Sequence, residues 1–348
     1  MSSRVEVAKL AGVTPAVVSY VLNGNRPVSK GTRAKVLAAI DELDYRPNAL
    51  ARSLAMARSN TLGVLVPDSS NPFFAELATA IEDAAFDRGL IVLLGNTVDN
   101  RDRELTYVRT FLDRKVDGLI ICPSSESGHL MPELDRSGVP VVFTDRAVGL
   151  SSATRVLVDN EQGAYEATQH LVEHGHRRIG CISGPEPLLG AMERLAGWRR
   201  AVAEAGSDPA DELCRNSEFD SEGGYQAMHA LIADQPDLDA VFVSSDFQAI
   251  GALRALSERN LSVGTDIALT SFDGIGAGEY AQPRLTTSAQ PFQEVANQTL
   301  AMLAHMMDHP AAPAAPPTVL PTTLVRRESC GCTQEPPAPD GPDAGTGD

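Results

Sequence analysis

The chain has little of what marks secreted, membrane-spanning and disulfide-stabilised proteins. Only five cysteines and one tryptophan occur in 348 residues, and aromatic residues make up 5%. A small, odd number of cysteines excludes a dense disulfide framework and predicts reduced thiols. The start Met1-Ser2-Ser3 has no apolar stretch, and no run of about 18 apolar residues follows it. We therefore expect no secretion signal, no membrane span and a cytoplasmic location.

Sequence motifs for catalysis and cofactor binding are also missing. The first predicted strand is followed by Pro67-Asp68-Ser69-Ser70-Asn71-Pro72, which is neither a G-x-G-x-x-G loop nor a Walker A loop. We find no G-x-S-x-G elbow and no metal-binding histidine pair, so we predict no catalytic residue, no cofactor and no metal. Cys330-Gly331-Cys332 has the spacing of a metal or redox pair, but the sequence places no histidine near it, which disfavours that interpretation.

Charge is distributed unevenly along the chain. Residues 1–58 carry nine Lys/Arg and four Asp/Glu, a net charge of +5, whereas the whole chain carries −17. Residues 59–348 therefore carry −22. A basic amino-terminal segment on an acidic body is expected when only that segment meets the phosphates of a nucleic acid.

The amino-terminal residues predict an all-α helix-turn-helix domain over 1–46. Gly12 supplies the positive φ that a tight turn between two helices requires, Thr14 suits the N-cap of the second helix, and Pro15 suits its first turn. A third helix is predicted over Thr32–Leu43. Its apolar face would comprise Val36, Leu37, Ile40 and Leu43. A three-helix protein-binding domain fits the same spacing, and the basic charge favours DNA.

From Thr61 onward, alternating strands and helices predict parallel sheets covered by helices on both faces. The pattern restarts near Asn160, so we expect a doubly wound α/β body of two lobes with a cleft between them. The predicted strands are Thr61–Val66, Leu90–Leu94, Gly118–Cys122, Val139–Phe143, Arg178–Ile182, Ala240–Ser244, Ile267–Phe272 and Val319–Val325. The predicted helices are Phe73–Arg88, Arg101–Arg114, Asn160–His174, Arg194–Ala205, Ser221–Ala233 and Asp246–Glu258.

Ligands of open parallel sheets bind at the carboxyl ends of the strands. The candidate residues at these ends, or near a crossover between the lobes, are Asn71, Phe73, Asp145, Arg146, Arg194, Phe219, Ser245, Asp246, Asp273 and Gln290. Arginine and aspartate beside an aromatic ring suit a polyhydroxy ligand, because the charged groups bond hydroxyls and the ring packs on the apolar sugar face. A strand-end cap or an interlobe hydrogen bond is the alternative role for each single polar residue. We expect Arg194 and Asp273 to carry most of the site.

Many short runs of residues match one family collinearly. They include Val7-Ala8, Ala11-Gly12-Val13, Val18-Ser19, Leu22-Asn23-Gly24, Tyr45-Arg46-Pro47-Asn48, Ala51-Arg52-Ser53-Leu54, Asn71-Pro72-Phe73-Phe74, Gly175-His176-Arg177-Arg178-Ile179, Arg194-Leu195-Ala196-Gly197-Trp198 and Phe272-Asp273. From about Val5 to Arg327 the chain resembles the lac/gal repressor (LacI–GalR) family of bacterial transcription regulators. The body of that family is similar in turn to sugar-binding periplasmic proteins.

The resemblance implies how the headpiece would meet DNA. The second helix would lie in the major groove. Bases would be read by Pro15, Ala16 and Tyr20, and the DNA backbone would be contacted by Thr14, Ser19 and Asn23. The family often has a guanidinium-bearing residue at Tyr20, and tyrosine cannot read guanine bidentately. The hinge residues Asn48, Ala51, Arg52 and Leu54 would enter the minor groove, with Leu54 as an apolar wedge.

The resemblance also bears on the effector. The family contacts its effector at the positions of Arg194, Phe219, Ser245, Asp273 and Gln290. Ser245 replaces the usual asparagine, so one hydroxyl contact differs. Leu188 stands where purine-responsive relatives have an arginine, which disfavours a purine effector.

We therefore expect a DNA-binding headpiece (1–46), a hinge (47–58), an effector-binding and dimerisation core (61–328) and a disordered tail (333–348). The N-lobe would comprise about 61–159 and 291–319, and the C-lobe about 160–289 and 320–328. The hypothesis is a homodimeric repressor of carbohydrate-related genes that binds a palindromic operator in double-stranded DNA and responds to a small-molecule effector such as a sugar. The alternative is a solute-binding protein or an α/β enzyme without a DNA function. The basic headpiece argues against the first, and the missing motifs argue against the second.

Overall fold

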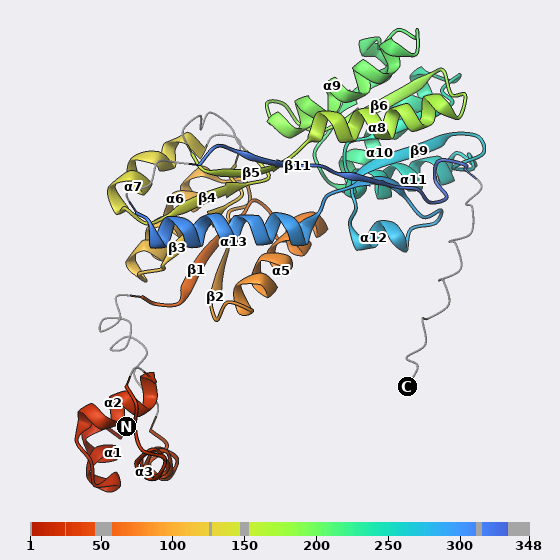
Figure 1. The fold of residues 1–348 in the computed structure, drawn as a ribbon. Helices are drawn as coiled ribbons and strands as arrows, with labels where there is room; N and C mark the ends of the chain where they lie inside the picture. Colours follow the sequence, from red (N-terminus) through yellow and green to blue (C-terminus); the bar gives the residue numbers. More distant parts are fainter. Residues whose placement is uncertain are drawn as a thin grey trace, which may run out of the picture. The chain divides into compact units, whose positions relative to one another are not determined.

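The structure is a computed structural model that describes residues 2–24, 26–45, 58–124, 127–146, 153–310 and 315–332 (Figure 1). The chain divides into two compact units, Met1–Asn60 and Thr61–Asp348. The predicted minor-groove residues Asn48, Ala51, Arg52 and Leu54 and the predicted tail 333–348 lie outside the described residues.

The amino-terminal unit contains three helices, α1 (Arg4–Ala11), α2 (Pro15–Asn23) and α3 (Lys30–Glu42). Gly12 has φ +66° and ends α1, as the turn requires. Thr14 is the extended N-cap residue of α2, as predicted, and its side chain makes no capping hydrogen bond. The expected apolar face of α3 is partly wrong, since Leu37 is 50% exposed and Ala39 is buried instead.

The small core of this unit is formed by short side chains from all three helices, which lets the helices approach closely. Its buried members are Val7, Ala8, Ala11, Val18, Val21, Val36 and Ala39. In the described part of the chain, no single helix has the length and apolar composition to cross a membrane. The pair Arg4–Ala11 and Pro15–Leu22, bent by 100°, meets those criteria only when taken together.

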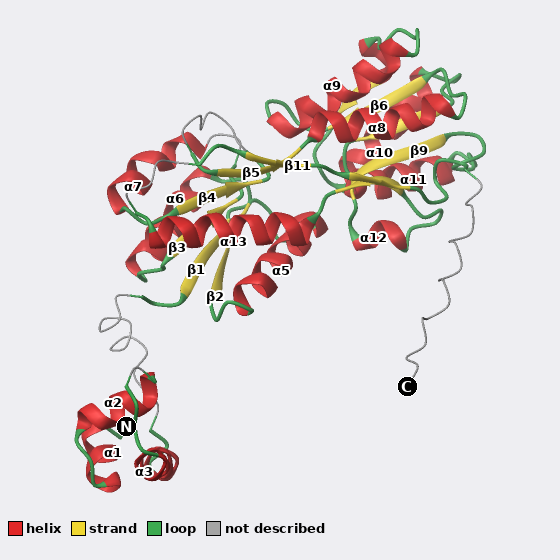
Figure 2. Cartoon of the chain, in the orientation of Figure 1, coloured by secondary structure: helices red, strands yellow, loops and turns green. Residues whose placement is uncertain are grey.

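The first sheet of the larger unit has the strand order β11-β5-β4-β3-β1-β2. Its strands are β1 (Thr61–Val66), β2 (Ile91–Asn96), β3 (Gly118–Ile121), β4 (Val141–Thr144), β5 (Arg155–Val158) and β11 (Thr318–Leu320), and every pairing is parallel. Helices α5 (Pro72–Phe86) and α13 (Phe292–Asp308) cover one face, and α6 (Arg101–Asp113) and α7 (Met131–Ser137) lie with the other (Figure 2). Successive residues of each strand therefore pack alternately into two separate hydrophobic cores, one on each face of the sheet.

The second sheet has the order β12-β10-β9-β8-β6-β7. Its strands are β6 (Ile179–Ser183), β7 (Cys214–Asn216), β8 (Ala240–Val243), β9 (Ala268–Asp273), β10 (Thr286–Ala289) and β12 (Thr323–Val325), with only the β10–β12 pair antiparallel. Helices α8 (Asn160–Glu173) and α9 (Leu189–Glu204) pack together on one side. Helices α10 (Ser221–Asp234) and α11 (Asp246–Glu258) pack together on the other, and the short α12 (Gly276–Glu279) follows β9. This arrangement is the predicted doubly wound α/β body.

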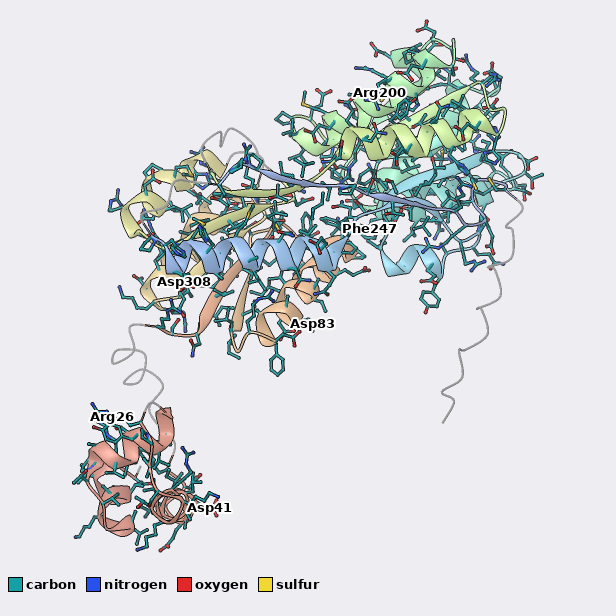
Figure 3. The ribbon with its side chains drawn as sticks, in the orientation of Figure 1. Arg26, Asp41, Asp83, Arg200, Phe247 and Asp308 are labelled. Carbon is teal, nitrogen blue, oxygen red and sulfur yellow. The ribbon has the colours of Figure 1, made fainter. Side chains whose placement is uncertain are left out.

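The chain passes between the two sheets three times, after β5, after β10 and between β11 and β12. The predicted single strand Val319–Val325 is wrong. It is two strands in different sheets, because Pro321 cannot continue a ladder and the chain crosses over at that point. Side chains also join the sheets. Phe247 of α11 packs against the core of the first sheet, and Figure 3 labels it beside the end of α13.

Candidate ligand cavity and nucleic-acid interface

A cavity lies where the carboxyl ends of the two sheets face each other, and its empty volume of about 300 Å³ includes space open to solvent. It is lined by Asn71, Phe73, Phe74, Asp145, Arg146, Arg194, Phe219, Ser245 and Asp273. The predicted site residues Asn71, Phe73, Asp145, Arg146, Arg194, Phe219, Ser245 and Asp273 are therefore brought together, and Asp246 and Gln290 are not among them. The side chains come from helices and strand ends in both halves of the body, so a ligand held here would contact both halves.

Arg194 lies at the centre of the site. It projects from α9, and its Nη1 donates to Asp273 Oδ1 at 3.0 Å and to the Ser244 carbonyl at 2.7 Å. Its Nε donates to Asn160 Oδ1 at 2.8 Å. The guanidinium lies 3.9 Å from the ring centroid of Phe272, a cation–π arrangement. These contacts hold the planar group in one orientation, with Phe219 also beside it.

The carboxylates of the cavity are poorly solvated. Burial raises the pKa of Asp273 to about 7, and the neighbouring Arg194 opposes that rise. Burial also raises the pKa of Asp145, against the lowering effect of Arg146 and Arg194. Asp145 directly follows β4 and has φ +66°, and Asp273 ends β9 with φ +110°. Such backbone costs about 1–3 kcal/mol and is concentrated at functional sites. Together the two aspartates and two arginines form a largely buried set of strong acceptors and donors.

On the side of the cavity next to the first sheet, a residue makes a hydrogen bond to the half of the body that contains the second sheet. Asn71 caps α5 by accepting from Phe73 N at 3.0 Å, and its Nδ2 donates to the Phe219 carbonyl at 3.0 Å. Arg146 Nη1 donates to Asp99 Oδ1 at 2.9 Å, and its guanidinium lies 5.2 Å from the ring centroid of Phe74. The Asn71–Phe219 bond directly couples the two halves of the cavity.

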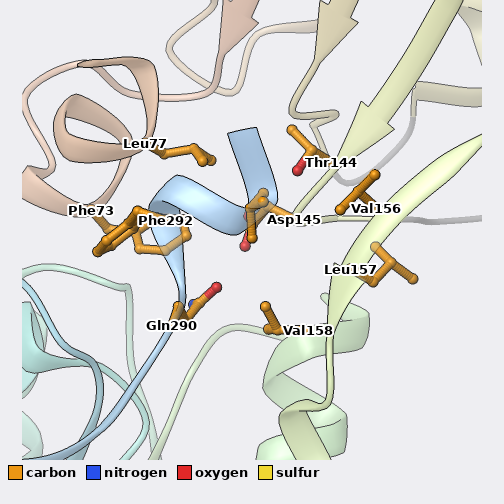
Figure 4. A pocket seen from close by; sticks show the side chains of 10 residues that line it. Phe73, Leu77, Thr144, Asp145, Val156, Leu157, Val158, Gln290 and Phe292 are labelled. Carbon is orange, nitrogen blue, oxygen red and sulfur yellow. The ribbon is translucent and has the colours of Figure 1, made fainter. Parts of the chain in front are cut away.

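Gln290 lies in an adjoining cavity of about 230 Å³, where Figure 4 shows it with Asp145 and Phe73. Its Nε2 donates to Asp273 Oδ1 at 3.0 Å. Gln290 lies just before α13, where the chain crosses between the sheets. Its hydrogen bond therefore orients Asp273 from this crossover. Leu188 lines a third adjoining cavity, of about 270 Å³, with Arg194 and Phe219.

The prediction that Asp246 contacts a ligand is not supported by its geometry. Its carboxylate is 0% exposed and accepts from Gly274 N at 2.8 Å and Ile275 N at 2.9 Å. Ser271 also donates to it. These bonds fix the loop after β9, which is the strand-end role weighed as the alternative. Ser245 both lines the cavity and caps α11 by accepting from Gln248 N at 3.1 Å.

Sequence reasoning missed two residues at this site. Asn160, the first residue of α8, accepts from Arg194 and also donates to Glu193 Oε2 at 3.0 Å. Phe74 forms an edge-on pair with Phe73, with ring centroids 5.0 Å apart. Asn160 lies two residues after the strand Arg155–Val158, and recognising that strand would have placed Asn160 at a strand end that faces the cleft.

The outer surface of α2 is the candidate nucleic-acid interface. Thr14, Pro15 and Ala16 are exposed at its amino end. Tyr20 is half-buried, with the Arg26 guanidinium 5.1 Å from its ring centroid. Ser19 Oγ accepts from Arg4 at 2.8 Å. Asn23 is the last residue of α2. A helix whose exposed amino end carries small side chains beside arginines can approach base edges closely.

Comparison with known proteins identifies the family. The model of bacterial regulatory proteins, lacI family, matches residues 5–48, and the model of periplasmic binding proteins and sugar-binding domain of the LacI family matches residues 59–318. The chain belongs to the LacI family. As a LacI-family protein it is a DNA-binding transcriptional regulator, and the predicted fold class is confirmed.

This LacI-family chain is similar to several characterised proteins over nearly its whole length. It is 36% identical to the ribose operon repressor of Escherichia coli (strain K12), over 89% of this chain and 94% of that protein. It is 35% identical to catabolite control protein A of Priestia megaterium, over 87% and 92%. A lac repressor dimer bound to operator and an anti-inducer superimposes with a TM-score of 0.84 at 28% identity, over 95% and 99% of the two chains. The complex of the regulator CelR with cellobiose gives a TM-score of 0.72 at 31% identity, over 94% and 100%. The curated relatives are regulators rather than enzymes.

Proposed function

We propose that two copies of this chain bind an inverted-repeat operator and repress genes of carbohydrate use, and that a sugar in the cavity between the sheets controls this binding. The observation that carries the proposal is the buried Arg194–Asp273 pair, which lies between the two sheets of a body joined to a helix-turn-helix headpiece. Bacterial operators lie in the cytoplasm, and we place the protein there.

The DNA part of the proposal assigns base reading to Pro15, Ala16 and Tyr20 and backbone contacts to Thr14, Ser19 and Asn23. The exposed amino end of α2 and the +5 charge of residues 1–58 support it. The lac repressor structure noted above is a dimer on its operator. The hinge residues Asn48, Ala51, Arg52 and Leu54 are proposed to fill the minor groove between two headpieces.

The sugar part rests on the chemistry of the cavity. Largely buried arginine and aspartate groups offer strong hydrogen bonds to hydroxyls, and the Phe219 and Phe73 rings offer apolar faces. CelR is solved with cellobiose, and a LacI-family regulator of Enterococcus faecium is solved with ribose at 28% identity and a TM-score of 0.69, over 79% of this chain and 100% of that chain. A ligand that contacts both sheets prefers one arrangement of the sheets, and this preference is how it would alter DNA binding.

We expect duplexes selected from random sequence by the full chain to be inverted repeats, bound about 10³-fold or more tightly than unspecific DNA. Mobility shifts with and without ribose or cellobiose measure both affinities. Ala16→Glu is expected to abolish operator preference, because it brings a negative charge to the base-reading face. Leu37→Glu, which places the same charge on an exposed position of α3, is the control. Equal affinity for inverted-repeat and random duplexes would refute the DNA part of the proposal.

Exposed apolar side chains at the edge of the first sheet support a dimer. Phe86 is 71% exposed, Ile91 58%, Leu94 50% and Val98 53%, and β2 is the last strand of its sheet. A neighbouring set of large apolar side chains on an edge strand is typical of an interface.

We expect the double variant Ile91→Asp/Leu94→Asp to be monomeric, because it buries two charges in the proposed interface. Light scattering after size-exclusion chromatography should show half the molar mass of the unmodified chain, and operator affinity should fall in parallel. Tyr280→Asp is the control, since Tyr280 is 89% exposed on the other half of the body. An unmodified chain that is monomeric, or a double variant that stays dimeric, would remove this surface from the proposal.

A further inference from the structure

Two histidines and two cysteines meet where the carboxyl-terminal segment crosses α8. His170 and His174 are one turn apart on α8, with ring centroids 4.4 Å apart. Cys332 Sγ lies 3.3 Å from His170 Nε2 and 3.0 Å from His174 Nε2. The ligand atoms of His170, Cys330 and Cys332 all lie within 4.8 Å of one another. His174 is not one of these three residues, and it joins them through its contact with Cys332. In the described part of the chain, no other three potential ligand residues meet this closely.

We propose that His170, His174, Cys330 and Cys332 form a Cys₂His₂ site for Zn²⁺. Zinc takes four such ligands in tetrahedral geometry, with Zn–S near 2.3 Å and Zn–N near 2.0 Å, which places S and N ligand atoms about 3.5 Å apart. The observed S···N separations of 3.0 and 3.3 Å need only small side-chain movements to reach that value. Soft thiolates with imidazoles select zinc over magnesium or calcium.

The orientation of His174 matches that of a metal ligand. Its Nδ1 lies 2.7 Å from the His170 carbonyl oxygen, so the Nδ1 hydrogen can be donated there while Nε2 faces the thiol. Metal-binding histidines commonly donate their second ring N–H to a backbone carbonyl in this way. His170 and Cys330 are 3% and 2% exposed, and His174 is exposed. The buried side chains of His170 and Cys330 would hold the ion away from solvent, and the ion would enter past the exposed His174.

The turn that presents the thiols is fixed by backbone contacts. Gly331 has φ +76°, and a Cβ there would lie 2.2 Å from the Gly264 carbonyl oxygen, so only glycine fits. Leu269 N donates to the Ser329 carbonyl at 2.7 Å, and Thr286 N donates to Ser329 Oγ at 2.8 Å. The cysteines are therefore positioned by the second sheet itself.

The site would clamp the carboxyl-terminal segment onto α8. Four protein ligands leave no open position for a substrate, which is typical of structural zinc. Binding requires the thiolates, so the two thiol protons would pass to solvent as the ion enters. The metal interpretation of Cys330-Gly331-Cys332 was disfavoured for want of a nearby histidine. The histidines lie 162 and 158 residues from Cys332 in the sequence and are brought to it only by the fold.

The test uses the full chain, kept reduced, loaded with zinc chloride and dialysed against metal-free buffer. We expect about one zinc ion per chain by elemental analysis, and a raised unfolding temperature relative to the stripped chain. Cobalt chloride in place of zinc should give thiolate-to-metal charge-transfer absorption. Cys332→Ser and His174→Gln are expected to lose the zinc. Both positions are more exposed than Cys330 and His170, so these variants are expected to fold.

The chain offers matched controls for each ligand type. His305 and His309 on α13 have the same spacing, ring centroids 4.5 Å apart and a His309 Nδ1···His305 O separation of 3.1 Å. Among the described residues neither of these rings contacts a cysteine, whereas the Nε2 of His174 lies 3.0 Å from Cys332 Sγ. His305→Gln and Cys214→Ser should therefore keep the zinc. Zinc uptake below one-tenth of an ion per chain by the reduced protein would overturn the proposal. Full uptake by Cys332→Ser, or loss in His305→Gln equal to that in His174→Gln, would overturn it as well.

Discussion

Replacing Arg194 with methionine is expected to lower the free energy of unfolding by about 3–5 kcal/mol near pH 8, because it leaves a buried carboxylate without its partner. Arg194 and Asp273 are 6% and 4% exposed, and their closest N and O atoms are 3.0 Å apart. The same change leaves the Ser244 carbonyl and Asn160 Oδ1 without the donors that satisfy them. Urea denaturation measures the loss, and calorimetry with ribose or cellobiose measures sugar binding, which should disappear.

The loss should depend on pH in a defined direction. Asp273 has a pKa of about 7 in the fold, against about 3.9 in an unfolded chain. Between these values the folded chain binds more protons than the unfolded one, so the contribution of Asp273 to stability falls as pH rises through that window. Without Arg194 the pKa of Asp273 rises further, and the fall extends to higher pH. Arg194→Met should therefore be more destabilising near pH 8 than near pH 6.

Two further variants separate folding from binding. Arg194→Met/Asp273→Asn should regain much of the stability near pH 8, because no unpaired buried charge remains, and should still bind no sugar. Arg199→Met is the control on the same helix. Its partner Asp211 is 2.8 Å away, but the side chains are 46% and 92% exposed, so the cost should be below about 1 kcal/mol. Sugar binding by the double variant at unmodified affinity would contradict the proposed role of the pair.

The sequence predicted those helices and strands that carry a clear local pattern, such as an unbroken apolar run or a capped helix. Thr61–Val66 is an uninterrupted apolar strand between two covered faces, and Asp246–Glu258 is a helix with a serine cap, and the structure has both at the predicted bounds. The strands Arg155–Val158, Cys214–Asn216 and Thr286–Ala289 were missed. Each is only three or four residues long and is defined by pairing with other strands, so the local sequence carries little signal.

For the candidate site as well, some residues could be predicted from the sequence and others could not. The strand-end rule located Arg194 and Asp273 because topology alone brings strand ends together. The rule could not predict that the Asp246 carboxylate accepts hydrogen bonds from the backbone N–H groups of Gly274 and Ile275. Nor could it find the His/Cys group, because helix periodicity places His170 and His174 on one face but says nothing of a segment that returns from the chain end.

Gly197→Ala is expected to lower the free energy of unfolding by about 2–3 kcal/mol, the cost of overpacking. Gly197 lies on α9 against α8, and a Cβ there would lie 2.3 Å from the Glu161 carbonyl oxygen and 2.8 Å from Tyr165 N. Backbone atoms cannot rotate away, so the helices must separate by about 1 Å, which outweighs the roughly 1 kcal/mol that alanine adds to helix propensity. Thermal and urea unfolding measure the change.

Separation of these helices should also weaken the ligand site, because α8 supplies Asn160 and α9 supplies Arg194, which share a 2.8 Å hydrogen bond. Gly190→Ala, at the start of α9, is the matched control. Its nearest neighbour is Asn160 Nδ2 at 3.4 Å, so stability should be unchanged or rise by up to about 1 kcal/mol. If both alanines behave alike, then the close approach at Gly197 does not set the helix spacing. A stable Gly197→Ala with weakened sugar binding would instead show that the two helices separate without cost and that their spacing serves the site alone.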